Sequence, residues 1–167
     1  MNGVPLAVLS ARSLLAGTGD ALAVVREGDV ILARALREAG CEVLESHACA
    51  RGMGASLAAG VMASRSAGGW LVALGDMPRI APATHAAVKR ALEAGALVAA
   101  ATDAASGRRG HPVAFGGSLG DELARLDGDE GARALVAGRR EALVAVPVDD
   151  PGIFRDVDTR GDLQALA

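Results

Sequence analysis

The sequence predicts an α/β protein, a three-layer α/β/α sandwich with a mostly parallel sheet. Apolar runs suited to strands alternate with segments of helical periodicity along the chain, the pattern produced by crossover connections between parallel strands. Hydrophobic residues make up 51% of the chain but aromatic residues only 2%, so the core must be built from Ala, Val and Leu in closely packed elements. No repeat or linker divides the 167 residues, and we expect a single domain over residues 1–167.

The expected strands are short apolar runs, and the expected helices carry apolar residues three and four positions apart. Strands are expected at residues 21–25, 42–45, 70–74, 97–101, 112–115 and 143–148. Helices are expected at residues 5–16, 29–39, 55–66, 82–93, 119–126, 130–137 and 160–166. The last helix is expected to begin after Thr159, which together with Asp162 three residues later resembles a capping box with Asp in place of Glu.

Charge and hydropathy exclude two classes of partner. The formal charge of −3 and the pI near 5.6 leave no basic face of the kind that binds nucleic acid. No apolar stretch approaches the ~20 residues needed to cross a bilayer, and no signal peptide is recognisable, so we expect no membrane partner and a cytoplasmic location. Cys41 and Cys49 match no zinc-binding spacing, and they are expected to be unpaired thiols in a reducing compartment.

The strand at 70–74 ends in the turn Gly75-Asp76-Met77-Pro78, which makes Asp76 the first candidate site residue. In an open α/β sheet the ligand binds beyond the carboxyl ends of the strands. An Asp held there by a tight turn can bind Mg²⁺ against phosphate oxygens. The alternative is a turn Asp that caps the following helix.

Two Gly-rich loops carry further candidates. Gly52, Gly54, Ser56 and Leu57 lie where a helix begins, so free amides and the positive end of the helix dipole could hold a phosphate or a base edge. The alternative is a Gly-rich turn from strand to helix. The segment 128–133 is interpreted first as a helix start in which Asp129 caps the first turn.

Basic and acidic loops add the remaining candidates. The segment 106–113 combines a glycine hinge with Arg108 and Arg109, whose guanidinium groups suit phosphate, and with His111 at the start of a strand. Surface arginines and a lone His also have ordinary structural explanations. The carboxylates at 149–150 and 156–158 precede the last helix and could supply a second metal ligand facing Asp76.

In this order the loops resemble those of the molybdenum cofactor nucleotidyltransferases, and among the MobA-like proteins they are most similar to the cytidylyltransferases. The resemblance covers essentially the whole chain. It rests on five motifs in register: Gly52-Met53-Gly54-Ala55-Ser56-Leu57, Gly75-Asp76-Met77-Pro78, Gly110-His111-Pro112-Val113, Gly128-Asp129-Glu130-Gly131-Ala132-Arg133, and Val148-Asp149-Asp150-Pro151 with Asp156-Val157-Asp158-Thr159.

The resemblance implies that a terminal phosphate of the molybdopterin cofactor attacks the α-phosphate of an NTP, with Mg²⁺ bridging and pyrophosphate leaving. It implies that Asp76 and Asp158 are catalytic metal ligands. The other site residues it implies are Gly52, Gly54, Ser56 and Leu57 around the nucleotide, and His111 and Arg133 on the acceptor side. CTP is favoured over GTP because Gly75 stands where guanylyl-transferring relatives more often carry Cys.

The chain departs from the family at its start. Family members begin with a strand and a loop of the form Leu-Ala-Ala-Gly-x-Ser-x-Arg-Met-Gly, followed by a Lys, which wraps the NTP phosphates; the only lysine here, Lys89, lies in an expected helix. The missing first strand would lie between the strands at 21–25 and 70–74. We expect the native polypeptide to be longer, and the 167-residue chain to transfer no nucleotide alone. If the 167-residue chain does transfer a nucleotide, another loop must hold the triphosphate, and the arginines of residues 106–110 are the expected group.

Two other functions stay open. The first is a non-catalytic relative that binds nucleotide, cofactor or a molybdoenzyme, and the second is a sugar-phosphate nucleotidyltransferase. A smaller departure is Ala81, which precedes Pro82 where the family usually has a capping Ser or Thr, at a cost of about 1 kcal/mol in helix stability.

Overall fold

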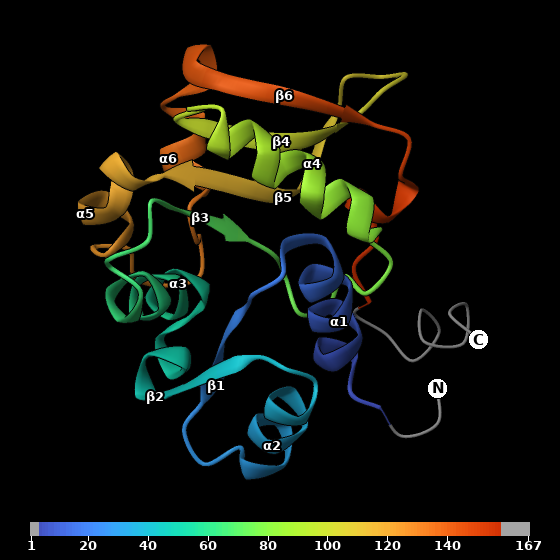
Figure 1. The fold of residues 1–167 in the computed structure, drawn as a ribbon. Helices are drawn as coiled ribbons and strands as arrows, with labels where there is room; N and C mark the ends of the chain where they lie inside the picture. The colour runs from blue at the N-terminus through green and yellow to red at the C-terminus, as the bar shows by residue number, and fades with distance from the viewer. Residues whose placement is uncertain (1–3, 158–167) are drawn as a thin grey trace.

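The strands lie in two separate sheets, as the computed structural model of residues 4–157 shows (Figure 1). β1 (Leu22–Arg26) and β2 (Glu42–Ser46) form a parallel pair. The second sheet has the order β3-β5-β4-β6. Its strands are β3 (Gly69–Val72), β4 (Val98–Asp103), β5 (Arg109–Gly116) and β6 (Leu143–Val148). The α/β class is confirmed, and every expected strand is present.

β5 makes the larger sheet mixed, because it runs antiparallel to both β3 and β4 while β4 and β6 are parallel. β4 and β5 are joined by a tight hairpin in which the Asp103 amide donates to the Arg108 carbonyl at 2.9 Å. Gly107 has a φ of 69°, a left-handed conformation that glycine adopts without strain. A connection this short cannot make a parallel crossover, so the hairpin fixes the direction of β5.

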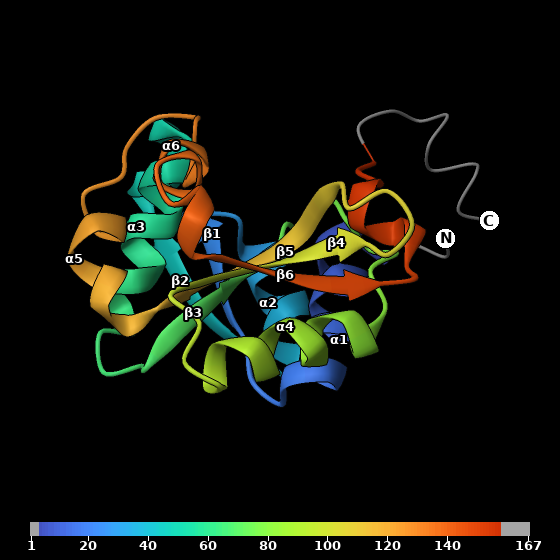
Figure 2. The same ribbon diagram turned by 90° about the horizontal axis from the view of Figure 1, so that it is seen from above.

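Helices cover both faces of the larger sheet, as Figures 1 and 2 show. The longer ones are α1 (Leu6–Thr18), α2 (Val30–Glu38), α3 (Met53–Ala63) and α4 (Pro82–Glu93). The helices expected at 119–126 and 130–137 are shorter, as α5 (Gly120–Leu123) and α6 (Arg133–Ala137). Short 3-10 segments complete the fold: η1 (His47–Arg51), η2 (Gly117–Leu119), η3 (Arg140–Ala142) and η4 (Pro151–Phe154). The helix expected at 160–166 lies outside the described residues.

The central strand β4 separates two cores. Its Val98 and Ala100 pack with residues of α3, α5 and α6, whereas Ala99 and Ala101 pack with Val88 of α4. All four β4 side chains are fully buried. Because successive side chains of a strand point to opposite faces, this alternation produces the three layers that the sequence predicts.

β1 and β3 do not pair with each other, and each is an edge of its own sheet within the described part of the chain. α1 instead links the smaller sheet to α4, the helix that covers one face of the larger sheet. Its Val8 packs with Val25 of β1 and with α2, while its Gly17 lies so close to α4 that a Cβ there would be 2.3 Å from the Pro82 carbonyl. Lys89 of α4 donates to the Thr18 carbonyl at the end of α1, at 2.6 Å. The single lysine therefore has a structural partner.

A remote carboxylate caps α4 in place of the missing Ser or Thr at Ala81. Asp150 accepts a hydrogen bond from the Ala81 amide at 2.8 Å and from the Thr84 hydroxyl at 2.6 Å. Its other oxygen accepts from the Gly152 amide at 2.9 Å. These bonds offset the cost expected for Ala81, and they tie the start of α4 to η4.

We expect Asp150→Ala to lower the free energy of unfolding by about 2 to 4 kcal/mol, because hydrogen bonds to a charged group contribute about 1.5 to 3 kcal/mol each and partly buried donors would lose their acceptor. Urea unfolding followed by circular dichroism measures the change. The exposed neighbour Asp149→Ala is the matched control. Equal midpoints for the two variants would show that the cap contributes nothing.

Amide exchange tests the break between the sheets. β1 and β3 are hydrogen-bonded along one side only, whereas β4 and β5 have a neighbouring strand on each side. We expect peptides of β1 and β3 to exchange at least about tenfold faster than peptides of β4, since strands with few backbone partners open locally at lower free energy. Equal protection of β1, β3 and β4 in hydrogen–deuterium exchange mass spectrometry would contradict a split sheet.

Candidate functional site

The loop after β3 carries Asp76 and is held from two sides. From α1, the Ser10 hydroxyl donates to the Gly75 carbonyl at 2.9 Å and the Ser13 hydroxyl donates to the Ile80 carbonyl at 2.5 Å. On the other side, the Val157 amide donates to the Asp76 carbonyl at 3.0 Å. The position of the Asp76 backbone is therefore fixed by bonds at both ends of the loop and at Asp76 itself.

The Asp76 carboxylate has one oxygen that the fold leaves unsatisfied. Oδ1 is buried and has no hydrogen-bond partner among residues 4–157. A buried polar atom in a native protein nearly always has a partner, so each exception needs an explanation such as an ion or a water molecule. A buried carboxylate oxygen at the carboxyl end of a sheet strand is a suitable ligand for a divalent cation.

His111 lies beside Asp76 on the neighbouring strand. β3 and β5 are antiparallel, and Val72 at the end of β3 pairs with Val113. The loop after β3 therefore lies beside the first residues of β5. Burial lowers the pKa of His111, the Asp76 carboxylate partly opposes this, and the Arg109 guanidinium lowers it further. Its Nδ1 is also buried without a partner in the described part of the chain. Burial of the ring thus favours the neutral form of the imidazole.

Two glycines bring the third loop against this pair. A Cβ on Gly152 would lie 2.2 Å from the Arg79 carbonyl, and one on Gly110 would lie 2.4 Å from the Ile153 carbonyl. Neither position has room for a side chain. The segments after β3 and β6 and the first residues of β5 thus meet at one end of the larger sheet.

The segment 106–110 forms the end of the hairpin turn and the first residues of β5. The Asp103 carboxylate accepts from the Ser106 amide at 2.7 Å, which stabilises the turn and lowers the pKa of Asp103. Arg108 stacks over the Phe154 ring, 4.2 Å from its centroid. Arg109 is exposed and is close enough to His111 to influence its pKa.

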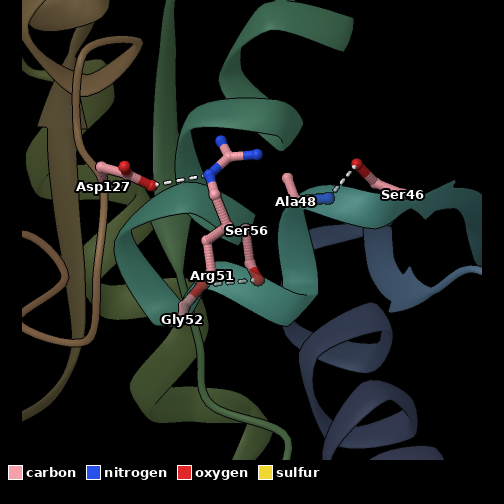
Figure 3. A network of polar contacts seen from close by, with 6 residues as sticks. All are labelled: Ser46, Ala48, Arg51, Gly52, Ser56 and Asp127. Atoms are coloured by element: carbon pink, nitrogen blue, oxygen red, sulfur yellow. Dashed lines mark hydrogen bonds and ion pairs between the residues drawn. The ribbon is translucent and has the colours of Figure 1, made fainter.

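The start of α3 forms a second group of candidate residues (Figure 3). The Gly54 amide donates to the Gly128 carbonyl at 2.7 Å, and Arg51 pairs with Asp127 at 3.0 Å. The Ser56 hydroxyl donates to the Gly52 carbonyl at 3.0 Å, and Leu57 packs against the core. This first turn therefore contacts the loop that precedes α6.

Glycine is required at both positions of this second group. Gly52 has a φ of 114°, and a Cβ there would lie 2.3 Å from Asp129. A Cβ on Gly54 would lie 2.7 Å from the Asp127 carbonyl. The two glycines thus serve the close approach of residues 127–129, whatever else they contact.

The contacts divide the predicted site residues into two groups. Asp76 and His111 lie together at one end of the larger sheet. Gly52 and Gly54 form the other group, against residues 127–129. A few residues further along the chain, the exposed Arg133 begins α6. Asp158 lies outside the described residues. The sequence did not single out Ser10 and Ser13, whose available signal was a pair of serines three positions apart in a largely apolar helix. Asp150 was suggested as a possible metal ligand, but both of its carboxylate oxygens are bonded within the fold.

Two absences bear on function, both restricted to residues 4–157. No three His, Cys, Asp or Glu side chains there gather into a metal site. No helix there is both long and apolar enough to cross a membrane. A cation at Asp76 would therefore need ligands from a substrate or from residues beyond the described range.

Comparison with solved structures finds proteins of similar fold. The Rv0371c protein of Mycobacterium tuberculosis has a structure with a TM-score of 0.73 and 31% identity, covering 95% of this chain and 82% of its own. A structure of Rv0371c in complex with manganese gives a TM-score of 0.75 and 27% identity, over 95% of this chain and 84% of that one. A nucleotidyl transferase from Methanothermobacter has a TM-score of 0.78 at 21% identity, over 99% and 80% of the chains, which shows the fold alone.

Sequence comparison gives the family directly. No curated protein was found to match the chain. The family model of the MobA-like NTP transferase domain matches residues 1–152. That match spans both groups of candidate residues and all six strands. The chain belongs to the MobA-like NTP transferase domain family.

Proposed function

We propose that this protein transfers a CMP group, or a GMP group, from an NTP to the terminal phosphate of a molybdopterin-type cofactor and releases pyrophosphate. The single observation that carries the proposal is Oδ1 of Asp76, which is buried without a hydrogen-bond partner among residues 4–157, in a loop fixed by α1 and by Val157. CTP is favoured by Gly75 before Asp76. We place the reaction in the cytoplasm, with a molybdoenzyme as a further partner of the product.

Asp76 and Asp158 would hold a divalent cation, Mg²⁺ in the simplest case. The unsatisfied oxygen of Asp76 fits such an ion. Val157 supports the pairing with Asp158, because its amide bonds to the Asp76 carbonyl and the next residue in the chain is Asp158. When bound, the cation supplies positive charge that neutralises the phosphate oxygens of the NTP.

The reaction needs positioning and charge more than covalent help from the protein. An oxygen of the acceptor phosphate attacks the α-phosphorus of the NTP, and the bond from that phosphorus to the bridging oxygen of the β-phosphate breaks, so that pyrophosphate leaves. Arg109 is exposed beside His111 and suits a phosphate by its planar donors. Gly52, Gly54, Ser56 and Leu57 would line the nucleotide, with His111 and Arg133 toward the acceptor.

A non-catalytic relative is the alternative. It would bind nucleotide or cofactor through the same Asp76 edge without transfer. Binding of metal and CTP that depends on Asp76, without release of pyrophosphate by the 167-residue chain, would support this alternative. Transfer of the nucleotide to a sugar phosphate in place of molybdopterin would support the second alternative, a sugar-phosphate nucleotidyltransferase.

We expect Asp76→Asn to weaken metal-dependent CTP binding by at least about 100-fold, because even residues that only support a metal ligand contribute 10- to 100-fold to affinity. Isothermal titration calorimetry gives the affinity, and pyrophosphate release with molybdopterin as acceptor gives the activity. Asp149→Asn, an exposed acidic control, should change neither. Unchanged binding in Asp76→Asn would refute the proposed site.

Ser13→Ala tests whether α1 positions the Asp76 loop. Loss of the bond to Ile80 should weaken metal affinity by roughly tenfold, as for other supporting residues, and cost about 1 kcal/mol of stability. The exposed Ser118→Ala is the control. A variant that loses stability but keeps its metal affinity would assign Ser13 a purely structural role.

A further inference from the structure

Among residues 4–157, two buried polar atoms, one in the loop after β3 and one in β5, have no hydrogen-bond partner at the same end of the larger sheet. They are Oδ1 of Asp76, in the loop after β3, and Nδ1 of His111, in β5. Each comes from a backbone segment that glycine contacts or hydrogen bonds hold in place. The two side chains interact electrostatically but share no hydrogen bond within residues 4–157.

One ligand can explain both atoms. A carboxylate oxygen is only an acceptor, and Nδ1 is also an acceptor in the imidazole tautomer that carries its proton on Nε2, so in that tautomer neither atom can satisfy the other. A group that accepts electron pairs from both is needed, and a divalent cation is the simplest such group. We propose that His111 Nδ1 and Asp76 Oδ1 ligate the same divalent cation. This inference rests on the proposed function, because it adds a nitrogen ligand to the metal site proposed above.

A nitrogen ligand changes which cation the site selects. Mg²⁺ takes oxygen ligands almost exclusively, whereas imidazole suits first-row transition ions, and Mn²⁺ accepts carboxylate and imidazole together. The site is therefore selective for a transition ion such as Mn²⁺ over Mg²⁺. The His111 ring would turn its Nε2–H away from the metal, which leaves Nδ1 free to bind.

Pulsed electron paramagnetic resonance tests the ligation directly, with Mn²⁺ alone as the probe. The wild-type chain should show ¹⁴N modulation from a bound imidazole. His111→Gln should keep the fold, bind Mn²⁺ at least about tenfold more weakly and lose the ¹⁴N signal. The exposed His47→Gln, a matched control, should keep both.

A second variant reverses the selectivity. His111→Asp replaces the nitrogen with an oxygen donor, so the ratio of Mg²⁺ to Mn²⁺ affinity should rise by roughly tenfold in calorimetric titrations. Thermal unfolding confirms that each variant is folded. Mn²⁺ binding that needs Asp76 but gives no ¹⁴N modulation in the wild type would overturn the role of His111 and leave the proposed function intact. A folded wild-type chain that binds no divalent cation would overturn both.

Discussion

The arrangement of this protein depends on one helix, α1, which packs on the smaller sheet and bonds to the loop that follows β3 of the larger one. α1 buries Val8 against β1 and α2, and it uses two serine hydroxyls to hold the carbonyls of Gly75 and Ile80 in the loop after β3. Because β1 and β3 share no hydrogen bonds, the position of the smaller sheet relative to the Asp76 loop is set by side-chain packing and by these bonds. Hydroxyl-to-carbonyl bonds are directional, so they fix the loop more closely than apolar contact alone. The helix that joins the sheets therefore also positions the site.

Close backbone contact explains why Asp76 keeps an unsatisfied oxygen. Gly110 and Gly152 allow three loops to meet without side chains between them, and Asp150 uses both carboxylate oxygens within the fold. Asp76 has a different environment, since the surrounding backbone bonds engage its carbonyl and leave Oδ1 without a partner among the described residues. Two carboxylates at the same edge thus have different roles. Asp150 stabilises the start of α4, whereas Asp76 is available for a ligand.

Local sequence patterns predicted local structure, and long-range contacts escaped them. Periodicity located the strands, and the Gly75–Pro78 turn placed Asp76 correctly at the end of β3. The cap of α4 could not be predicted, because its carboxylate comes from Asp150, 69 residues beyond Ala81. At Gly52 and Gly54 the sequence left both a ligand loop and a structural turn open. The structure shows that both glycines contact residues 127–129, a pairing of distant segments that no spacing reveals. The antiparallel β5 was missed because a hairpin was interpreted as a loop between parallel strands.

The two unpartnered atoms also bear on the stability of the sheet edge. β3 is hydrogen-bonded only to β5 along its length, and Asp76 and His111 extend from the adjoining ends of these two strands. A ligand shared by both side chains would join the loop after β3 to β5 beyond the last paired residues, Val72 and Val113. A ligand that binds only the folded state stabilises it by about 2.7 kcal/mol at 100 times its dissociation constant. That stabilisation would act on β3, which has a single neighbouring strand in the larger sheet. We therefore expect ligand binding at this site to be coupled to the ordering of β3.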